Sequence, residues 1–119
     1  GGLESRLISL LLAQPELVLY VSNERLLADS EQIDREILYR LIQFYQVQYQ
    51  GGEQQTQEVV FSAFDKDSVK RLAHITATEH LIEKTVNESL ESLRLRRRQD
   101  FVMGLEKLLN GIQRKLSLQ

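Results

Sequence analysis

Apolar side chains recur at intervals of three or four residues through almost the whole chain, which is the repeat of an α-helix. Only one proline and six glycines interrupt this repeat in 119 residues. The sequence therefore predicts an all-α fold, a compact helical bundle that forms one domain. The chain has no cysteine, which excludes disulfides, thiol catalysis and thiolate metal sites. No apolar run approaches the roughly 20 residues that a membrane-spanning helix needs.

The first three quarters of the chain are expected to form helical segments joined by short loops. These segments are predicted over residues 3–13, 15–21, 31–50, 54–64 and 66–74. Pro15 suits the first position of a helix, where its missing N–H costs nothing, and Gly51-Gly52 suits the end of one. The loop over residues 22–30 is expected to turn Leu26 and Leu27 toward the core.

A last long helix is predicted to start at a capping box, Thr76-Ala-Thr-Glu79, whose end side chains can satisfy each other's backbone donors. Its apolar stripe is Leu81, Ile82, Val86, Leu90 and Leu93. We expect a body of residues 3–93 and a tail of residues 94–119, after a Gly1-Gly2 cloning remnant. A turn near Met103-Gly104 would fold the tail into a projecting helical hairpin, although a bend or an unbroken helix also fits the sequence.

Charge is divided unevenly between the body and the tail. Residues 1–93 hold 15 acidic and 8 basic side chains, whereas residues 94–119 hold 2 acidic and 7 basic ones. Four of the basic residues form a run where the tail begins: Arg94, Arg96, Arg97 and Arg98. This run fits an electrostatic contact with an acidic partner, and it also fits a solvated helix face. Direct nucleic-acid binding is less favoured, because the body is acidic and the arginines have no neighbouring stacking aromatics.

A second apolar stripe follows the arginine run at helical spacing. It consists of Leu105, Leu108, Leu109, Ile112 and Leu116. Part of the stripe is expected to pack on the preceding helix through Phe101 and Val102. A two-helix hairpin is too thin to cover a whole apolar face, so we expect another part to bind a partner protein. Gln113, Arg114 and Lys115 flank the stripe and would form the polar rim of that contact.

The sequence contains no recognisable catalytic or metal-binding constellation, so neither a catalytic residue nor a cofactor is expected. His74 and His80 are six positions apart, do not share a helical face and have no carboxylate pair at ligand spacing. Asp65 and Asp67 fit the start of the helix at residues 66–74 better than an acid–base pair. The tyrosines of the third segment are expected to lie between core and surface: Tyr39, Tyr45 and Tyr49.

Two segments resemble the C-terminal domain of bacterial DnaG-type DNA primases. The first is Glu4-Ser-Arg-Leu-Ile-Ser-Leu-Leu-Leu-Ala-Gln-Pro-Glu-Leu17, a leucine-rich helix followed by a Pro-Glu-Leu helix start. The second is Glu83-Lys-Thr-Val-Asn-Glu-Ser-Leu-Glu-Ser-Leu-Arg94, which is similar to the long helix before the family's C-terminal hairpin. The order of the elements agrees from Leu3 to the last residue. The family often has a longer hairpin, whereas residues 99–119 leave room for only a tight turn.

The resemblance implies a cytoplasmic, non-catalytic domain that acts at the replication fork. In the family, this domain docks on the N-terminal domains of the DnaB-type hexameric replicative helicase and recruits primer synthesis, while the catalytic core lies elsewhere in the protein. Two other interpretations stay open: a self-associating helical domain, with hairpin exchange between two copies, and the N-terminal domain of the replicative helicase itself. The second is disfavoured, because the helicase domain's usual aromatic–His signature is not seen at residues 32–44.

Overall fold

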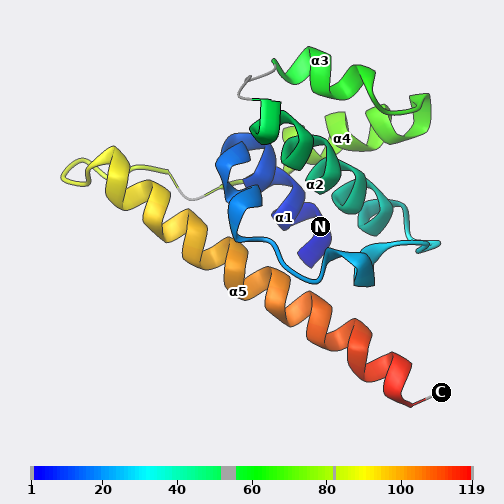
Figure 1. The fold of residues 1–119 in the computed structure, drawn as a ribbon. Helices are drawn as coiled ribbons and strands as arrows, with labels where there is room; N and C mark the ends of the chain where they lie inside the picture. Colours follow the sequence, from blue (N-terminus) through cyan, green and yellow to red (C-terminus); the bar gives the residue numbers. More distant parts are fainter. Residues whose placement is uncertain (1, 52–55, 82, 119) are drawn as a thin grey trace.

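The computed structural model describes residues 2–51, 56–81 and 83–118, and every regular element in these ranges is helical. The α-helices are α1 (Leu3–Ala13), α2 (Ile33–Gly51), α3 (Gln57–Ser62), α4 (Lys66–Thr78) and α5 (Leu90–Ser117). Two short 3-10 helices, η1 (Pro15–Tyr20) and η2 (Glu24–Leu27), lie between α1 and α2. Figure 1 shows α1 enclosed by the other helices, with α5 running along one side of the molecule. The all-α expectation is confirmed.

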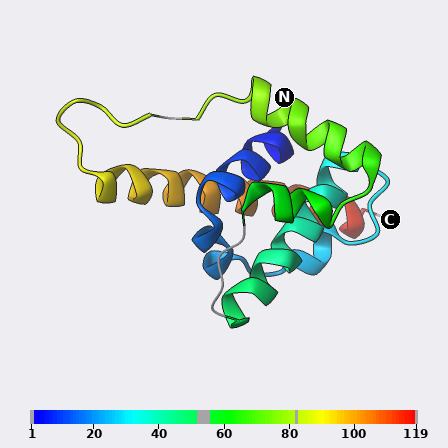
Figure 2. The same ribbon diagram turned by 90° about the horizontal axis from the view of Figure 1, so that it is seen from above.

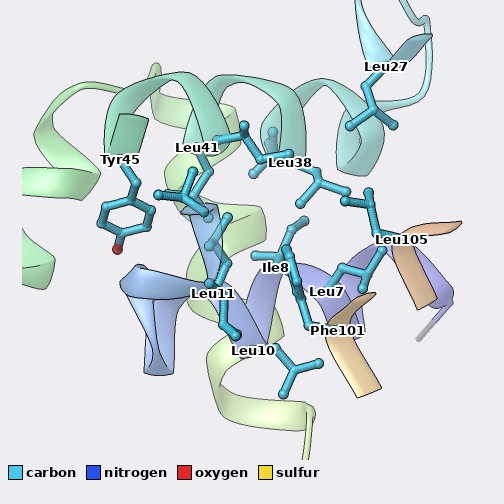
Figure 3. Close-up of a cluster of buried hydrophobic side chains, with 14 of the residues drawn as sticks. Leu7, Ile8, Leu10, Leu11, Leu27, Leu38, Leu41, Tyr45, Phe101 and Leu105 are labelled. Atoms are coloured by element: carbon cyan, nitrogen blue, oxygen red, sulfur yellow. The ribbon is translucent and has the colours of Figure 1, made fainter. Parts of the chain in front are cut away.

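The core forms around α1, because leucine and isoleucine occupy most of the circumference of this helix. Leu7, Ile8 and Leu11 are completely buried. They meet Leu38 and Leu41 from α2 and Phe101 from α5, which Figure 3 shows pointing into the same cluster. The helix from one end of the chain is therefore held between segments that are far away in sequence.

The loop between η1 and α2 behaves as the sequence predicts. Leu27 is completely buried at the end of η2, and Leu26 is partly buried against the core. Asn23 begins η2 with a φ of 60°, a left-handed conformation that asparagine tolerates better than most residues. A short 3-10 turn thus carries two leucines back toward α2 and α5.

Side chains cap both helices of the α3–α4 pair. Thr56 Oγ1 accepts a hydrogen bond from the Val59 N–H at 3.3 Å, and Asp65 Oδ1 accepts one from the Ser68 N–H at 2.8 Å. The expected cap at Asp65 is confirmed, while α4 extends four residues beyond the predicted end at residue 74. Leu72 of α4 is completely buried in the core.

The predicted start of the last helix is wrong. Thr76 lies inside α4, where its hydroxyl donates to the Ala73 carbonyl at 2.9 Å, and Glu79 follows the end of that helix. Residues 79–89 form a connection without regular structure in its described part, and Figure 2 shows it arching away from the body. Within the predicted stripe, Val86 is 95% exposed and Ile82 lies outside the described residues. The helix starts after Ser89, whose hydroxyl accepts from the Ser92 N–H at 3.0 Å.

The projecting hairpin is also wrong, because α5 continues unbroken from Leu90 to Ser117. Gly104 lies where the turn was expected, and it faces Leu7 and Leu3 of α1 instead of ending the helix. The absence of a side chain at this position lets the two helices approach. Of the three arrangements that fit the sequence, the structure contains the unbroken helix, which crosses the expected border between residues 93 and 94.

An ion pair fixes α5 on α1. Arg6 Nε donates to Asp100 Oδ2 at 2.9 Å, and a second guanidinium nitrogen of Arg6 contacts the same oxygen. The molecule is elongated, with extents of 49 × 30 × 29 Å. Both ends of α5 extend past the body in Figure 1. No helix in the described ranges is long and apolar enough to cross a membrane.

Candidate docking surface

The apolar stripe predicted for the tail is divided between the core and the surface. Leu105, Leu108 and Leu109 belong to the core cluster and keep only 4 to 7% of their surface exposed. Ile112 packs against this cluster as a partly buried residue, whereas Leu116 is 55% exposed. The three inner leucines hold α5 on the body and offer almost no surface to a partner. Only the outer end of the stripe is accessible.

The accessible end of α5 combines apolar and basic side chains. We call it the terminal patch and define it as Gln113, Arg114, Lys115, Leu116 and Leu118, all of which are exposed. Leu116 is 55% exposed and Leu118 is 83% exposed. Arg114 and Lys115 lie in the last turn of the helix, where positive charge complements the helix dipole. The patch therefore offers two leucines within a cationic surface.

Arginine side chains of the run after Leu93 make contacts inside the molecule. Arg94 Nε lies 3.9 Å from Glu16 Oε1, and Arg98 Nη1 donates to the Tyr20 hydroxyl at 2.9 Å. The guanidinium carbon of Arg98 also lies 4.9 Å from the centre of the Tyr20 ring. The run therefore fastens η1 to α5, and the side chain of Arg94 remains largely exposed.

Arg96 fastens the connection before α5. Its Nη2 lies 2.7 Å from Glu88 Oε1 and 3.5 Å from the Glu83 carbonyl oxygen. Burial raises the pKa of Glu88, but hydrogen bonds from Arg96 and from the Thr85 backbone N–H outweigh it and hold this pKa below its ordinary value. Glu88 is therefore ionised at neutral pH and keeps the turn at residues 85–88 closed.

Arg97 and His80 line a hollow of about 370 Å³ between α1, the end of α4 and the following connection. Its lining also includes Ser9, Glu79 and Glu83. His74, by contrast, is exposed on α4. No group of three histidine, aspartate or glutamate residues in the described ranges could hold a metal ion. The two histidines do not come together, and the hollow mixes both signs of charge.

The acidic pair before α4 has a structural role. The Ser68 backbone N–H and side chain hydrogen bond to Asp65 and lower the pKa of its carboxyl group. Asp67 is exposed in the first turn of the same helix, where negative charge is favourable. Both residues stabilise the start of α4, as the sequence indicates.

A surface beside η1 was not predicted from the sequence. Tyr20 is half exposed there, next to Leu95 and Val102 of α5, which are 44% and 37% exposed. A signal exists in the sequence, since Leu95, Val102, Leu109 and Leu116 follow one another at intervals of seven residues. This series shares Leu109 and Leu116 with the stripe described above and extends it toward the start of α5 through Leu95 and Val102.

The fold and the exposed end of α5 describe a helical domain with several accessible apolar groups on one long helix, among them Leu95, Met103 and Leu116. Comparison with known proteins adds no family: no family model, curated protein or solved structure matches this chain. A function must therefore be argued from the residues themselves and from the resemblance in the sequence.

Proposed function

We propose that this chain is the helicase-interaction domain of a bacterial DNA primase. It is a non-catalytic, protein-binding module that docks on the N-terminal domains of the hexameric replicative helicase in the cytoplasm. The primer synthesis that such docking recruits to the replication fork belongs to other parts of a primase. The proposal combines the resemblance of residues 4–17 and 83–94 with the accessible surface of α5.

The observation that carries the proposal is the terminal patch. Leu116 and Leu118 are exposed at the C-terminal end of α5, whereas Leu105, Leu108 and Leu109 of the same helix are buried. Isolated exposed leucines are common on surfaces, but here Leu116 in the last turn of α5 and Leu118 at its C-cap lie among basic and amide side chains. Specific interfaces commonly have this composition, an apolar centre with a polar rim.

Because α5 is unbroken, fewer modes of binding to the helicase are possible than with a hairpin. A hairpin would present two antiparallel helices to the helicase, whereas this chain presents a single helix end. The contact is therefore smaller than a hairpin would provide. Helix-in-groove recognition, in which a few apolar side chains enter a groove of the partner, is the mode that fits one helix.

Calorimetric titration tests the proposal directly. The chain is mixed with purified replicative helicases from several bacterial lineages and with their isolated N-terminal domains. Saturable binding to an N-terminal domain is expected. The variant with both Leu116→Asp and Leu118→Asp should weaken binding at least tenfold, because truncating or charging a central anchor commonly costs more than ~1.4 kcal/mol.

A matched control lies on the same helix. Met103 is 70% exposed and distant from the terminal patch, so Met103→Asp should leave helicase binding unchanged. Ile112→Asp is a poor test, because Ile112 packs against the core and its replacement also affects folding. Unchanged affinity of the folded double variant would remove the terminal patch from the mechanism. Absence of binding to every helicase would contradict the proposal as a whole.

Self-association is the second candidate function. Its supporting observation is that exposed apolar residues occur along the whole length of α5, including Leu90, Met103 and Leu116. A homodimer could cover several of them, as symmetric interfaces commonly do. Sedimentation velocity over a range of about 1 µM to 1 mM separates the two functions. A strictly monomeric chain would exclude this alternative.

A further inference from the structure

Two hollows lie end to end between α5 and the segment that contains η1. The first, of about 340 Å³, is lined by Leu17 and Leu95 among others, and the second, of about 300 Å³, by Leu26, Val102 and Leu109. Tyr20 lines both hollows. They therefore form one groove along the side of α5 that a single half-exposed tyrosine divides.

Arg98 lies at the division of the groove. Its guanidinium group contacts the hydroxyl and the ring face of Tyr20, and it also lines the first hollow. No carboxylate in the described part of the chain pairs with it. An arginine that stacks on an aromatic ring keeps N–H donors at its edge available for a carboxylate. The centre of the groove is thus positive.

The outer parts of the groove carry the opposite charge. Glu91 lines the first hollow and Glu106 lines the second, and both side chains belong to exposed residues of α5. Within the described ranges neither glutamate has a hydrogen-bonded or ion-pair partner. Arg94, which also lines the first hollow, is already near Glu16. The free charges along the groove therefore follow the order negative, positive, negative.

We propose that this groove binds an amphipathic helix of another protein that carries two apolar anchors with a carboxylate between them. One anchor fills the hollow at Leu95, the other fills the hollow at Val102 and Leu109, and the carboxylate pairs with Arg98. Basic residues at the two ends of the bound helix face Glu91 and Glu106. This surface lies along the side of α5 and shares only Gln113 with the terminal patch, so the proposal goes beyond docking through that patch.

The dimensions of the groove set the spacing of the anchors. Leu95 and the midpoint between Val102 and Leu109 are separated by roughly 16 Å along α5, or about three helical turns. On a bound helix, residues i and i+11 have this separation and share a face. Arg98 is about one turn from Leu95, so the carboxylate belongs one turn from the anchor that fills the first hollow.

The experiment uses a synthetic helical peptide as the probe. It carries leucine at positions i and i+11, glutamate one turn inside the first leucine, and lysines at its ends. Titration into the isotopically labelled chain, followed by two-dimensional NMR, should shift the backbone signals around Tyr20, Leu95 and Val102. A peptide with lysine in place of the central glutamate should bind at least fivefold more weakly, because it places like charges together.

A charge exchange tests the central contact. Arg98→Glu should reverse the preference, so that the lysine peptide binds better than the glutamate peptide. Lys107→Glu is the matched control, since Lys107 is an exposed cation of the same helix outside both the groove and the terminal patch, and the original preference should remain. Circular dichroism establishes that both variants keep the fold.

Three outcomes would overturn the proposal. The first is that neither peptide binds at millimolar concentration, and the second is that the shifted signals lie away from the groove. The third is that the groove signals shift with the concentration of the chain alone, which would assign the groove to a second copy. Loss of helicase binding in the separate terminal-patch variants leaves these results untouched, so the two proposals fail independently.

Discussion

A Cβ atom placed on Gly104 of α5 would lie only 3.0 Å from Leu7 Cδ2 of α1. Leu7 is completely buried, so it has little freedom to move away from an added group. Gly111 is seven residues further along the same helix and has open space where its Cβ would be. The two glycines of α5 therefore have the same backbone conformation but different surroundings.

This difference predicts opposite effects of substitution. Gly111→Ala should raise the free energy of unfolding by about 0.5–1 kcal/mol, since alanine is the better helix former. Gly104→Val should lower it by about 1–3 kcal/mol, because the added methyl groups overpack the contact with Leu7. Urea unfolding followed by circular dichroism measures both. Equal effects at the two positions would show that α5 does not pack closely on α1 at Gly104.

A substitution at Phe101 tests whether the part of α5 that follows the arginine run belongs to the hydrophobic core. It is completely buried although it follows the run, while the adjacent Val102 is 37% exposed. Phe101→Ala should lower the free energy of unfolding by about 3–5 kcal/mol through lost burial and a cavity. Val102→Ala should cost less than about 1 kcal/mol. A small effect of Phe101→Ala in urea unfolding would mean that residues 94–119 are separate from the body.

The raised pKa of Tyr45 leads us to expect a loss of stability at alkaline pH. Burial, together with the nearby Tyr49, raises the pKa of Tyr45 to about 12 from 10.0. The folded state therefore favours the neutral phenol, and this contribution is complete below pH 10 and is lost as pH rises toward 12. The stability of Tyr45→Phe should decrease less over this interval. Unfolding by urea at several pH values, with absorbance titration of the tyrosines, makes the comparison.

The lowered pKa of Asp65 leads us to expect that the start of α4 is less stable at acid pH. Its pKa is lowered in the folded state, so its contribution is present above the ordinary value of 3.8 and is lost as pH falls through the folded-state pKa. Asp65→Asn keeps an acceptor for the Ser68 N–H but cannot titrate. The protection of backbone amides against hydrogen exchange at the start of α4, relative to their intrinsic exchange rates, should decrease at low pH in the natural chain and stay constant in this variant.

The sequence predicts local structure well where a wide apolar helix face is followed by a helix-terminating proline or glycine. The segment 3–13 and the end of α2 at Gly51 are correct for this reason. The start of the last helix was wrong because Thr76 and Glu79 have the spacing of a capping box, and the same spacing also occurs at the end of a helix. Glu79 instead accepts a hydrogen bond from Ser5 at 3.3 Å, a contact across 74 positions that no local pattern contains.

For the candidate surfaces too, the sequence predicts the local helical pattern but not the contacts between distant segments. Helical periodicity placed Leu105, Leu108 and Leu116 on one stripe correctly, but it could not say how far along the helix the body extends. That limit depends on the position of α1 and η2, which pack against α5. The groove at Tyr20 was missed because it requires η1 and α5 to lie side by side. The position of Arg98 against Tyr20 depends on that packing.

The straight course of α5 has a mechanical consequence. One continuous helix of 28 residues contains both the buried Phe101 and the exposed Leu116, and Leu118 directly follows its last residue. A force applied at Leu118 is therefore transmitted along α5 to the buried contacts that this helix makes with α1. Any protein that grips the tip of this helix also holds, and can strain, the interior of the domain.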